Sequence, residues 1–134
     1  MRQLFAFIAG LIVAVLIIIM LQMIKEGLYP TPGDLDFNNK DLVLQWMETL
    51  PATAFIISAI AHGLAAFSAG FISGLTAGSS RMTVGIMAAS VIFILVLVYL
   101  FTYYFPTWFV VTDTVVTSVL GFTGVVSGSA RIVA

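Results

Sequence analysis

Four stretches of apolar residues, each long enough to cross a lipid bilayer, dominate this sequence of 134 residues. An α-helix spans the hydrocarbon core of a bilayer with about 20 residues, and the stretches meet that length at 4–24, 51–77, 83–105 and 107–130. In lipid, a helix satisfies all of its own backbone hydrogen bonds. We therefore predict an all-α membrane protein, in which four transmembrane helices form an antiparallel bundle and residues 1–134 make a single transmembrane domain.

The composition agrees with a chain surrounded mostly by lipid. Charged residues make up 8% of the chain and hydrophobic residues 61%, whereas soluble domains carry roughly a quarter charged residues. The net charge of −1 excludes the basic surface that nucleic-acid binding needs. The absence of cysteine excludes disulfides and thiolate metal sites. We therefore expect membrane lipids, and no nucleic acid, among the partners of this chain.

The longest connection follows the first span and contains a turn signal and an amphipathic segment. Prolines and a glycine between residues 29 and 34 predict the turn. Asn38 suits an N-cap, and Asp41 suits the third helical position after it. An apolar helical face follows at Leu42, Val43, Trp46, Met47 and Leu50. We predict a short interfacial amphipathic helix over residues 38–50; the alternative is an irregular loop packed over the bundle.

Aromatic and basic residues at the ends of the spans indicate how the chain sits in the membrane. Tryptophan and tyrosine anchor helices at the bilayer interface, and we predict such anchors at Trp46, Tyr103, Tyr104 and Trp108. Alternating spans put Arg2, Arg81 and Arg131 on one side and Lys25 and Lys40 on the other. Because cytoplasmic loops carry an excess of basic residues, we expect a multi-pass protein of the cell (inner) membrane with both termini in the cytoplasm.

Small residues recur at intervals of three or four along the spans, and such residues let membrane helices approach closely. The residues predicted to pack helices together are Ala6, Gly10, Ala14, Ala66, Gly70, Gly74, Gly78, Gly121, Gly124 and Gly128. Alternation puts all of them in the leaflet that holds the termini, so we predict a bundle that is pinched there and wider in the other leaflet. The plainer explanation is that glycine is common in membrane helices.

The third span has the longest run of bulky residues, at 91–101. We therefore expect this span to be the most exposed to lipid. Val96 and Val98 are expected to face the lipid tails, so that substituting either of them by leucine costs little stability.

Two ionisable side chains fall at membrane depth, where such groups are costly and mark candidate functional sites. His62 lies roughly 16 Å along the second span and Asp113 roughly 9 Å along the fourth, and this difference disfavours a direct pair. In one interpretation they contribute to an outward-facing polar pocket, with His62 at its base and Glu26 and Glu48 at its rim. In the structural alternative, which we favour, His62 bonds a neighbouring helix while Asp113 caps a turn or reaches interfacial water.

The sequence offers little that catalysis could use. One histidine cannot build a multi-histidine metal site, and no nucleophile and base can be paired by their spacing. No glycine-rich phosphate loop follows a strand. We therefore expect no enzyme activity, no catalytic residue, no metal site and no cofactor.

Short motifs along nearly the whole chain resemble a known group of proteins. They are Glu26-Gly27-Leu28-Tyr29-Pro30, Leu50-Pro51 before the second span, Ala61-His62-Gly63 with Gly70, and Pro106-Thr107-Trp108-Phe109. The pattern resembles small uncharacterised bacterial membrane proteins with four transmembrane helices, and this implies a bacterial membrane location but no activity. The chain also has the size of the small multidrug transporters, but its first span lacks their internal acidic residue.

The sequence favours a non-enzymatic membrane protein that acts by packing, as a homo-oligomer or as an accessory subunit of a larger membrane complex. The alternative is a small transporter or channel, whose outward-facing polar pocket receives a small molecule or an ion. His62 and Asp113 discriminate between the two. If they face a hydrated cavity, transport is favoured; if neighbouring side chains seal them, packing is favoured.

Overall fold

The computed structural model describes residues 1–130, which contain five helices. Four of them are long and apolar enough to cross a membrane: α1 (Arg2–Leu28), α3 (Ala52–Thr76), α4 (Arg81–Thr102) and α5 (Thr107–Ala130). The short helix α2 (Lys40–Glu48) lies between the first two. The predicted all-α class, with four spans and a short helix in the first connection, is confirmed. Arg131, which contributed to the predicted orientation, lies outside the described residues.

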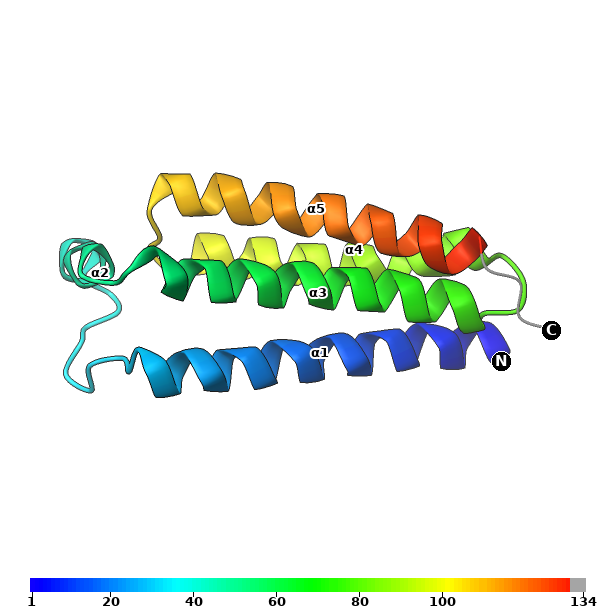
Figure 1. The fold of residues 1–134 in the computed structure, drawn as a ribbon, viewed down its shortest axis with the longest axis horizontal. Helices are drawn as coiled ribbons and strands as arrows, with labels where there is room; N and C mark the ends of the chain where they lie inside the picture. The colour runs from blue at the N-terminus through cyan, green and yellow to red at the C-terminus, as the bar shows by residue number, and fades with distance from the viewer. Residues whose placement is uncertain (131–134) are drawn as a thin grey trace.

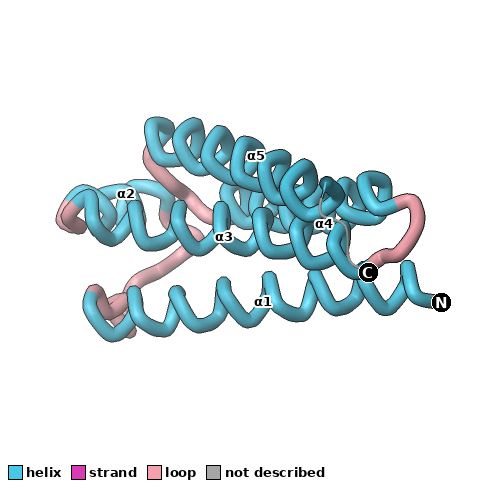
Figure 2. Tube along the Cα trace, turned by 45° about the vertical axis from the view of Figure 1, so that its right-hand side comes forward, coloured by secondary structure: helices cyan, strands magenta, loops and turns pink. Residues whose placement is uncertain are grey.

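The long helices pack side by side along one axis (Figures 1 and 2). Helix α2 lies at one end of the bundle, which we call the α2 end, and the start of α1 lies at the other, which we call the Met1 end. Chain direction alternates from span to span, so that α3 and α5 both run from the α2 end towards the Met1 end (Figure 1). This shared direction determines which residues of α3 and α5 lie level with each other.

Helix α3 is the centre of the bundle. It packs on α1, α4 and α5, whereas among the described helices α1 contacts α3 and α4 but not α5. Within the most apolar window of each span, 56% of the residues are buried in α3, 39% in α4 and 17% in α1. The expectation that the third span is the most exposed is therefore wrong, because α4 lies against both α3 and α5 while α1 lies at the edge. Val96 is buried and only Val98 faces outward.

The hairpin between α3 and α4 contains the one predicted packing residue that lies outside the spans. Gly78 follows the end of α3 and has a φ of +84°, in the left-handed region that glycine adopts without a steric penalty. Gly78 turns the chain there, and a Cβ at this position would lie 3.0 Å from the side chain of Arg2 on α1. The side chain of Arg81 stabilises the same turn, because its Nε donates to the carbonyl of Gly74 at 3.0 Å.

The other predicted packing residues are buried, and they bring helices of this same chain into backbone contact. A Cβ added at Gly124 or Gly128 would overlap the carbonyl oxygen of Phe67 or Phe71 on α3. A Cβ at Gly85 on α4 would lie 3.0 Å from the carbonyl oxygen of Gly70. All of these contacts lie in the half of the bundle towards the Met1 end.

Helix α2 lies across the α2 end of the bundle. Figure 1 views it almost along its own axis while the spans run across the picture. Its residues Val43 and Met47 are buried, and Leu42 of the predicted apolar face is 45% exposed.

The N-cap of α2 is Asn39, and the prediction of Asn38 is wrong. The side chain of Asn39 accepts a hydrogen bond from the backbone N–H of Leu42 at 3.2 Å. Asn38 belongs to the preceding turn, where its backbone N–H donates to Asp36 Oδ1 at 3.0 Å. The helix therefore starts at Lys40, two residues later than the predicted segment.

Candidate functional site

A buried histidine–carboxylate pair joins α3 to α5. His62 Nδ1 lies 2.6 Å from Asp113 Oδ2, and the two residues are 3% and 0% exposed. Thr117, one turn further along α5, donates its hydroxyl to Asp113 Oδ1 at 3.3 Å. Both carboxylate oxygens are therefore engaged. The expectation that the two side chains lie too far apart in depth to pair directly is wrong.

The pair forms because its side chains bridge the difference in depth between the two backbones. Ala66 of α3 packs against Gly121 of α5, and counting back along both helices puts His62 level with Thr117. Asp113 is thus one turn, roughly 6 Å, nearer to the α2 end. Side chains on a helix lean towards its N-terminus, which for both helices is the α2 end. The long imidazole of His62 therefore reaches back to the level of the short carboxylate.

Neighbouring side chains seal the pair. The ring of Tyr99 on α4 packs edge-on against the His62 ring, with centroids 5.5 Å apart. Ser58 lies one turn before His62 and is 2% exposed, and its hydroxyl has no hydrogen-bond partner within residues 1–130. His62 thus bonds a neighbouring helix, as the structural alternative expects. Its partner is Asp113, which is fully buried and neither caps a turn nor reaches interfacial water.

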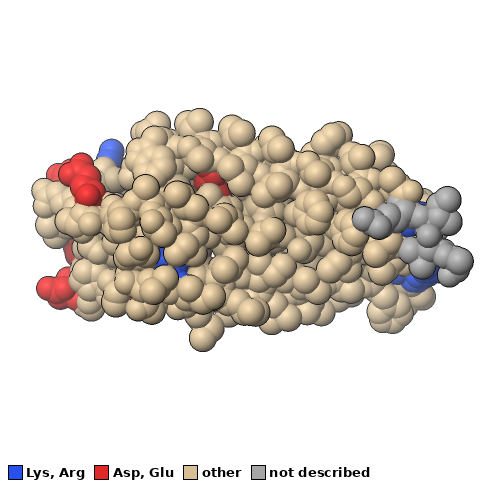
Figure 3. Space-filling model, in the orientation of Figure 1, with Lys and Arg blue, Asp and Glu red and all other residues tan. Residues whose placement is uncertain are grey.

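A cavity of about 510 Å³ lies between α2 and the bundle. Half of its lining residues are aromatic: Phe37, Trp46, Phe55, Tyr99, Tyr103 and Phe105. Its polar lining comes from Gln22, Lys25, Glu26 and Thr31. Figure 3 shows basic side-chain atoms recessed among uncharged ones in the half towards the α2 end. The volume of the cavity lies within the range of about 300–1,000 Å³ that is typical of small-molecule sites, which are also mostly apolar.

The two charged residues of the cavity differ in their surroundings. Glu26 accepts from the Thr31 backbone N–H at 2.7 Å and from the Thr31 hydroxyl at 2.8 Å, one bond to each carboxylate oxygen. This arrangement ties the loop to the end of α1. Lys25 is half-buried, and in the described chain no carboxylate comes within ion-pair distance of its ammonium group, because His62–Asp113 is the only such pair there. Lys25 is therefore the cation of the cavity that a ligand can reach.

The four residues predicted to form one polar pocket lie in three places. His62 and Asp113 make the sealed pair, and Glu26 lines the cavity. Glu48 lines a separate depression of about 390 Å³ beside Trp108. Tyr99 connects two of these places, since it lines the cavity and packs on His62.

Lys25 and Tyr99 are cavity residues that were not predicted to line a pocket; Lys25 contributed only to the predicted orientation. Lys25 is the first charged residue after an apolar run of twenty or so residues, and a lysine in that place normally reaches the interface. Its sequence context therefore gave no sign of a binding role. The predicted anchors Tyr103, Tyr104 and Trp108 are between 37% and 52% exposed at the α2 end.

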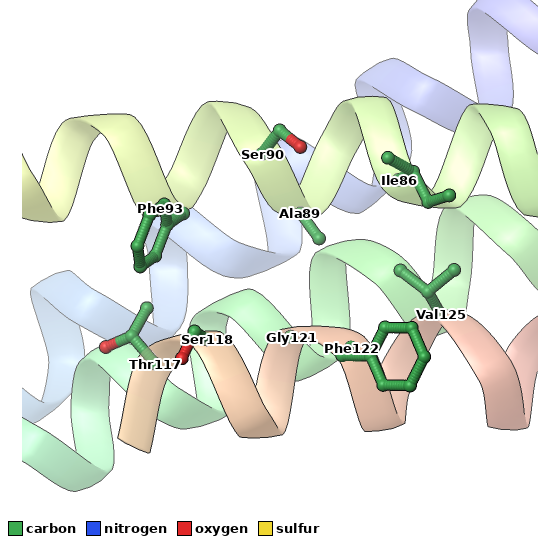
Figure 4. A pocket seen from close by; sticks show the side chains of 9 residues that line it. All are labelled: Ile86, Ala89, Ser90, Phe93, Thr117, Ser118, Gly121, Phe122 and Val125. Atoms are coloured by element: carbon green, nitrogen blue, oxygen red, sulfur yellow. The ribbon is translucent and has the colours of Figure 1, made fainter. Parts of the chain in front are cut away.

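A shallower groove of about 200 Å³ lies between α4 and α5. Its lining residues, labelled in Figure 4, are Ile86, Ala89, Ser90 and Phe93 on α4 and Thr117, Ser118, Gly121, Phe122 and Val125 on α5. The Ser118 hydroxyl donates to the carbonyl of Val115 at 3.0 Å. By contrast, the Ser90 hydroxyl is exposed and makes no hydrogen bond within the described part of the chain.

No protein-family model, curated protein or solved structure matches this chain. The resemblance to small bacterial four-span proteins therefore stays a prediction. The fold and the site define a multi-pass membrane protein with four spans, a sealed polar pair in its core and an aromatic cavity at one end.

Proposed function

We propose that this chain is a non-enzymatic membrane protein that binds a small molecule in the cavity at its α2 end. The observation that carries the proposal is the cavity itself, which combines a volume of about 510 Å³ with aromatic walls and few polar groups. Small-molecule sites usually have this composition, since the apolar wall supplies affinity and the few polar groups fix orientation. The backbone contacts of the Met1 half support the proposal, because they hold the helices that form the walls.

The two functions weighed from the sequence are affected differently by the structure. The packing role rested on the small-residue faces, but those faces contact helices of the same chain and no longer favour a partner. The transporter alternative rested on a pocket that contains His62 and Asp113, and this pair is sealed. Binding in a cavity is the part of that alternative that the geometry supports. With both termini in the cytoplasm of a bacterial cell, the cavity faces the outside of the inner membrane.

Binding can be tested with a tryptophan of the cavity wall as the reporter. The chain has two tryptophans, so Trp108→Phe leaves Trp46, which lines the cavity, as the only tryptophan. The purified variant in zwitterionic bilayers is screened against small molecules of varied charge, and both Trp46 emission and thermal stability are measured. A ligand at 100 times its Kd stabilises the folded state by about 2.7 kcal/mol, which a thermal scan resolves.

A pair of adjacent substitutions provides the control. Gln22 lines the cavity, so Gln22→Phe fills part of it and is expected to abolish the response. Met23 is 69% exposed on the same turn of α1, so Met23→Phe is expected to leave the response intact. The proposal fails if no compound of any charge changes either signal, or if the two phenylalanine variants behave alike.

A second candidate function is that of an accessory subunit in a homo-oligomer or a larger membrane complex, and the α4–α5 groove favours it. Ser90 exposes an unpartnered hydroxyl at hydrocarbon depth, and serine hydroxyls bond across membrane helices. Ser90→Ala is then expected to lower the yield of chemical crosslinking between subunits in membranes. Ser118→Ala should leave the yield unchanged, because that hydroxyl already bonds Val115. Equal yields from both variants would leave this candidate without support.

A further inference from the structure

We infer that the ligand of the cavity is an anionic amphiphile, a molecule with one carboxylate or phosphate group on a compact apolar body. The inference rests on the proposed binding function and names the ligand class for that same cavity. Three features of the lining carry it: the state of Lys25, the state of Glu26 and the aromatic wall.

Lys25 supplies the positive charge. It lies in the last turn of α1 and lines the cavity while half-buried. A lysine stem packs readily on apolar surface, but its ammonium group carries three donors that need acceptors. Within residues 1–130 the Lys25 ammonium has no ion-pair or hydrogen-bond partner. The adjacent Glu26 carboxylate acts on this charge only from beyond ion-pair distance. A charge partly withdrawn from water without a close partner is unfavourable, and an anion in the cavity would supply the missing acceptors.

Glu26 does not offer the cavity a matching site for a cation. Aromatic walls attract cations through their ring faces, so a quaternary ammonium ligand is the rival class. The carboxylate of the lining, Glu26, is exposed and is held at the end of α1 by its hydrogen bonds to Thr31. Water therefore screens its attraction for a cation, whereas the charge of the half-buried Lys25 is screened less. Lys25 would also repel a cation. The polar lining therefore favours an anion over a cation.

The aromatic wall sets the character of the rest of the ligand. The ring of Tyr99 packs against those of Tyr103 and Phe105, with centroids 5.3 Å and 5.1 Å apart. The ring of Phe37 meets that of Tyr103 edge-on at 6.2 Å. These contacts make one continuous apolar surface. Gln22 and Thr31 add uncharged polar groups to the lining. An apolar or aromatic body fits against the rings while its anionic group lies at Lys25.

Such a ligand has two sources, since Lys25 lies at the membrane rim. The anionic group belongs either to a free molecule that enters from water or to the headgroup of an anionic lipid. Both sources present the same chemistry to Lys25. The experiment therefore needs one arm for each source.

The first arm uses the Trp108→Phe background in phosphatidylcholine bilayers, with 4-(4-bromophenyl)butyrate as the free probe. Bromine quenches Trp46 at short range, so quenching reports entry into the cavity. The alcohol and the trimethylammonium compound with the same bromophenylbutyl body are the neutral and cationic controls. The second arm replaces the free probe by brominated phosphatidylglycerol in the bilayer and compares it with brominated phosphatidylcholine.

Charge-matched variants make the result specific to Lys25. We expect Lys25→Gln to weaken binding of the anion by about 10- to 150-fold, since a charged hydrogen bond of roughly 1.5–3 kcal/mol is lost. Lys40→Gln removes a charge from the same end of the protein but outside this cavity. Lys25→Arg keeps the charge inside it. Both variants should bind the anion as tightly as the Trp108→Phe protein does. Equal loss in Lys25→Gln and Lys40→Gln would overturn the inference, as would equal binding of the neutral or cationic compound.

The two arms distinguish a free anion from a lipid headgroup. They also distinguish failure of the anionic ligand class from failure of binding in the cavity. If brominated phosphatidylglycerol quenches more strongly than brominated phosphatidylcholine and displaces the free carboxylate, the anion is a lipid headgroup. If only the free carboxylate quenches, the ligand comes from water. Either of these two results supports an anionic ligand. If the alcohol binds as well as the carboxylate and Gln22→Phe still blocks both, the anion is refuted while binding in the cavity stands. If no probe binds, the proposed function itself fails.

Discussion

Replacing Gly124 by alanine is the sharpest test of how the Met1 half is packed. A Cβ at this position would overlap the carbonyl oxygen of Phe67 and lie 2.8 Å from both the carbonyl carbon and the Cα of that residue. Carbon atoms in contact are normally about 3.5–4.0 Å apart. The obstacle is backbone, which no rotamer change can move aside. Helices α3 and α5 must therefore separate locally by roughly 1 Å.

The expected magnitude follows from two opposing terms. Forcing one extra carbon into a packed interior typically costs about 1–3 kcal/mol, and a backbone clash belongs at the upper end of that range. Alanine gains about 1 kcal/mol over glycine in a helix. The net expectation for Gly124→Ala is a loss of about 2 kcal/mol in the free energy of unfolding.

Two other glycines give matched controls with the same chemical change. A Cβ at Gly27, in the last turn of α1, meets nothing within 4 Å, so Gly27→Ala should stabilise the protein by about 0.5–1 kcal/mol. A Cβ at Gly121 would lie 3.3 Å from the Cβ of Ala66, which calls for a small shift and predicts a change near zero. The three variants should therefore rank Gly27→Ala, Gly121→Ala, Gly124→Ala in falling stability.

The assay is equilibrium unfolding in mixed micelles with a rising fraction of denaturing detergent, followed by circular dichroism. All three variants are measured beside the unsubstituted chain. If Gly124→Ala proves as stable as Gly27→Ala, the backbone contact between α3 and α5 does not exist. The close packing of the Met1 half would then have to be abandoned.

Three further predictions concern the buried pair, the start of α2 and the hairpin after α3. Asp113→Leu should lower the free energy of unfolding by about 3 kcal/mol, because it leaves the His62 ring buried without its partner. The double variant with His62→Leu should recover part of that loss. A double-mutant cycle of unfolding free energies measures both effects. Asn39→Ala should cost about 1 kcal/mol through the lost cap and speed amide exchange in α2, whereas Asn38→Ala should change neither. Gly78→Ala should lower stability by roughly 1 kcal/mol, since φ is +84° there, and the same unfolding assay checks it.

The spans could be predicted from the sequence because their signal is local. A run of about 20 apolar residues has to cross the bilayer as a helix whatever its neighbours do. The predicted ends differ from the observed ones by a few residues, as at α1, which runs from Arg2 to Leu28 where 4–24 was expected. Helical hydrogen bonding continues into the polar flanks, which an apolar count omits. The cap of α2 was misplaced by one residue because Asn38 and Asn39 are chemically identical candidates.

The arrangement of the spans could not be predicted so well, because it depends on contacts between helices. A count of bulky residues suggested that the third span is the most exposed, yet α4 lies against both α3 and α5. Comparing backbone depths suggested that His62 and Asp113 lie apart, yet the long side chain of His62 leans back along α3 further than the short one of Asp113 does along α5, and their atoms come within 2.6 Å. That lean is a general property of helices. Including it, together with the register of α3 against α5, would have allowed the pair.

The position of the cavity follows from where the small residues of α1 end. The buried residues of α1 are Ala6, Gly10 and Ala14, which all lie in its first half and let it approach α3 closely. Beyond Ala14 the side chains facing the bundle are large, so α1 can no longer approach the other helices to backbone contact. There Gln22 and Lys25 face the aromatic residues of α3 and α4 across the cavity. The glycines and alanines of the Met1 half are thus the physical reason why the α2 end is wide enough to hold a ligand.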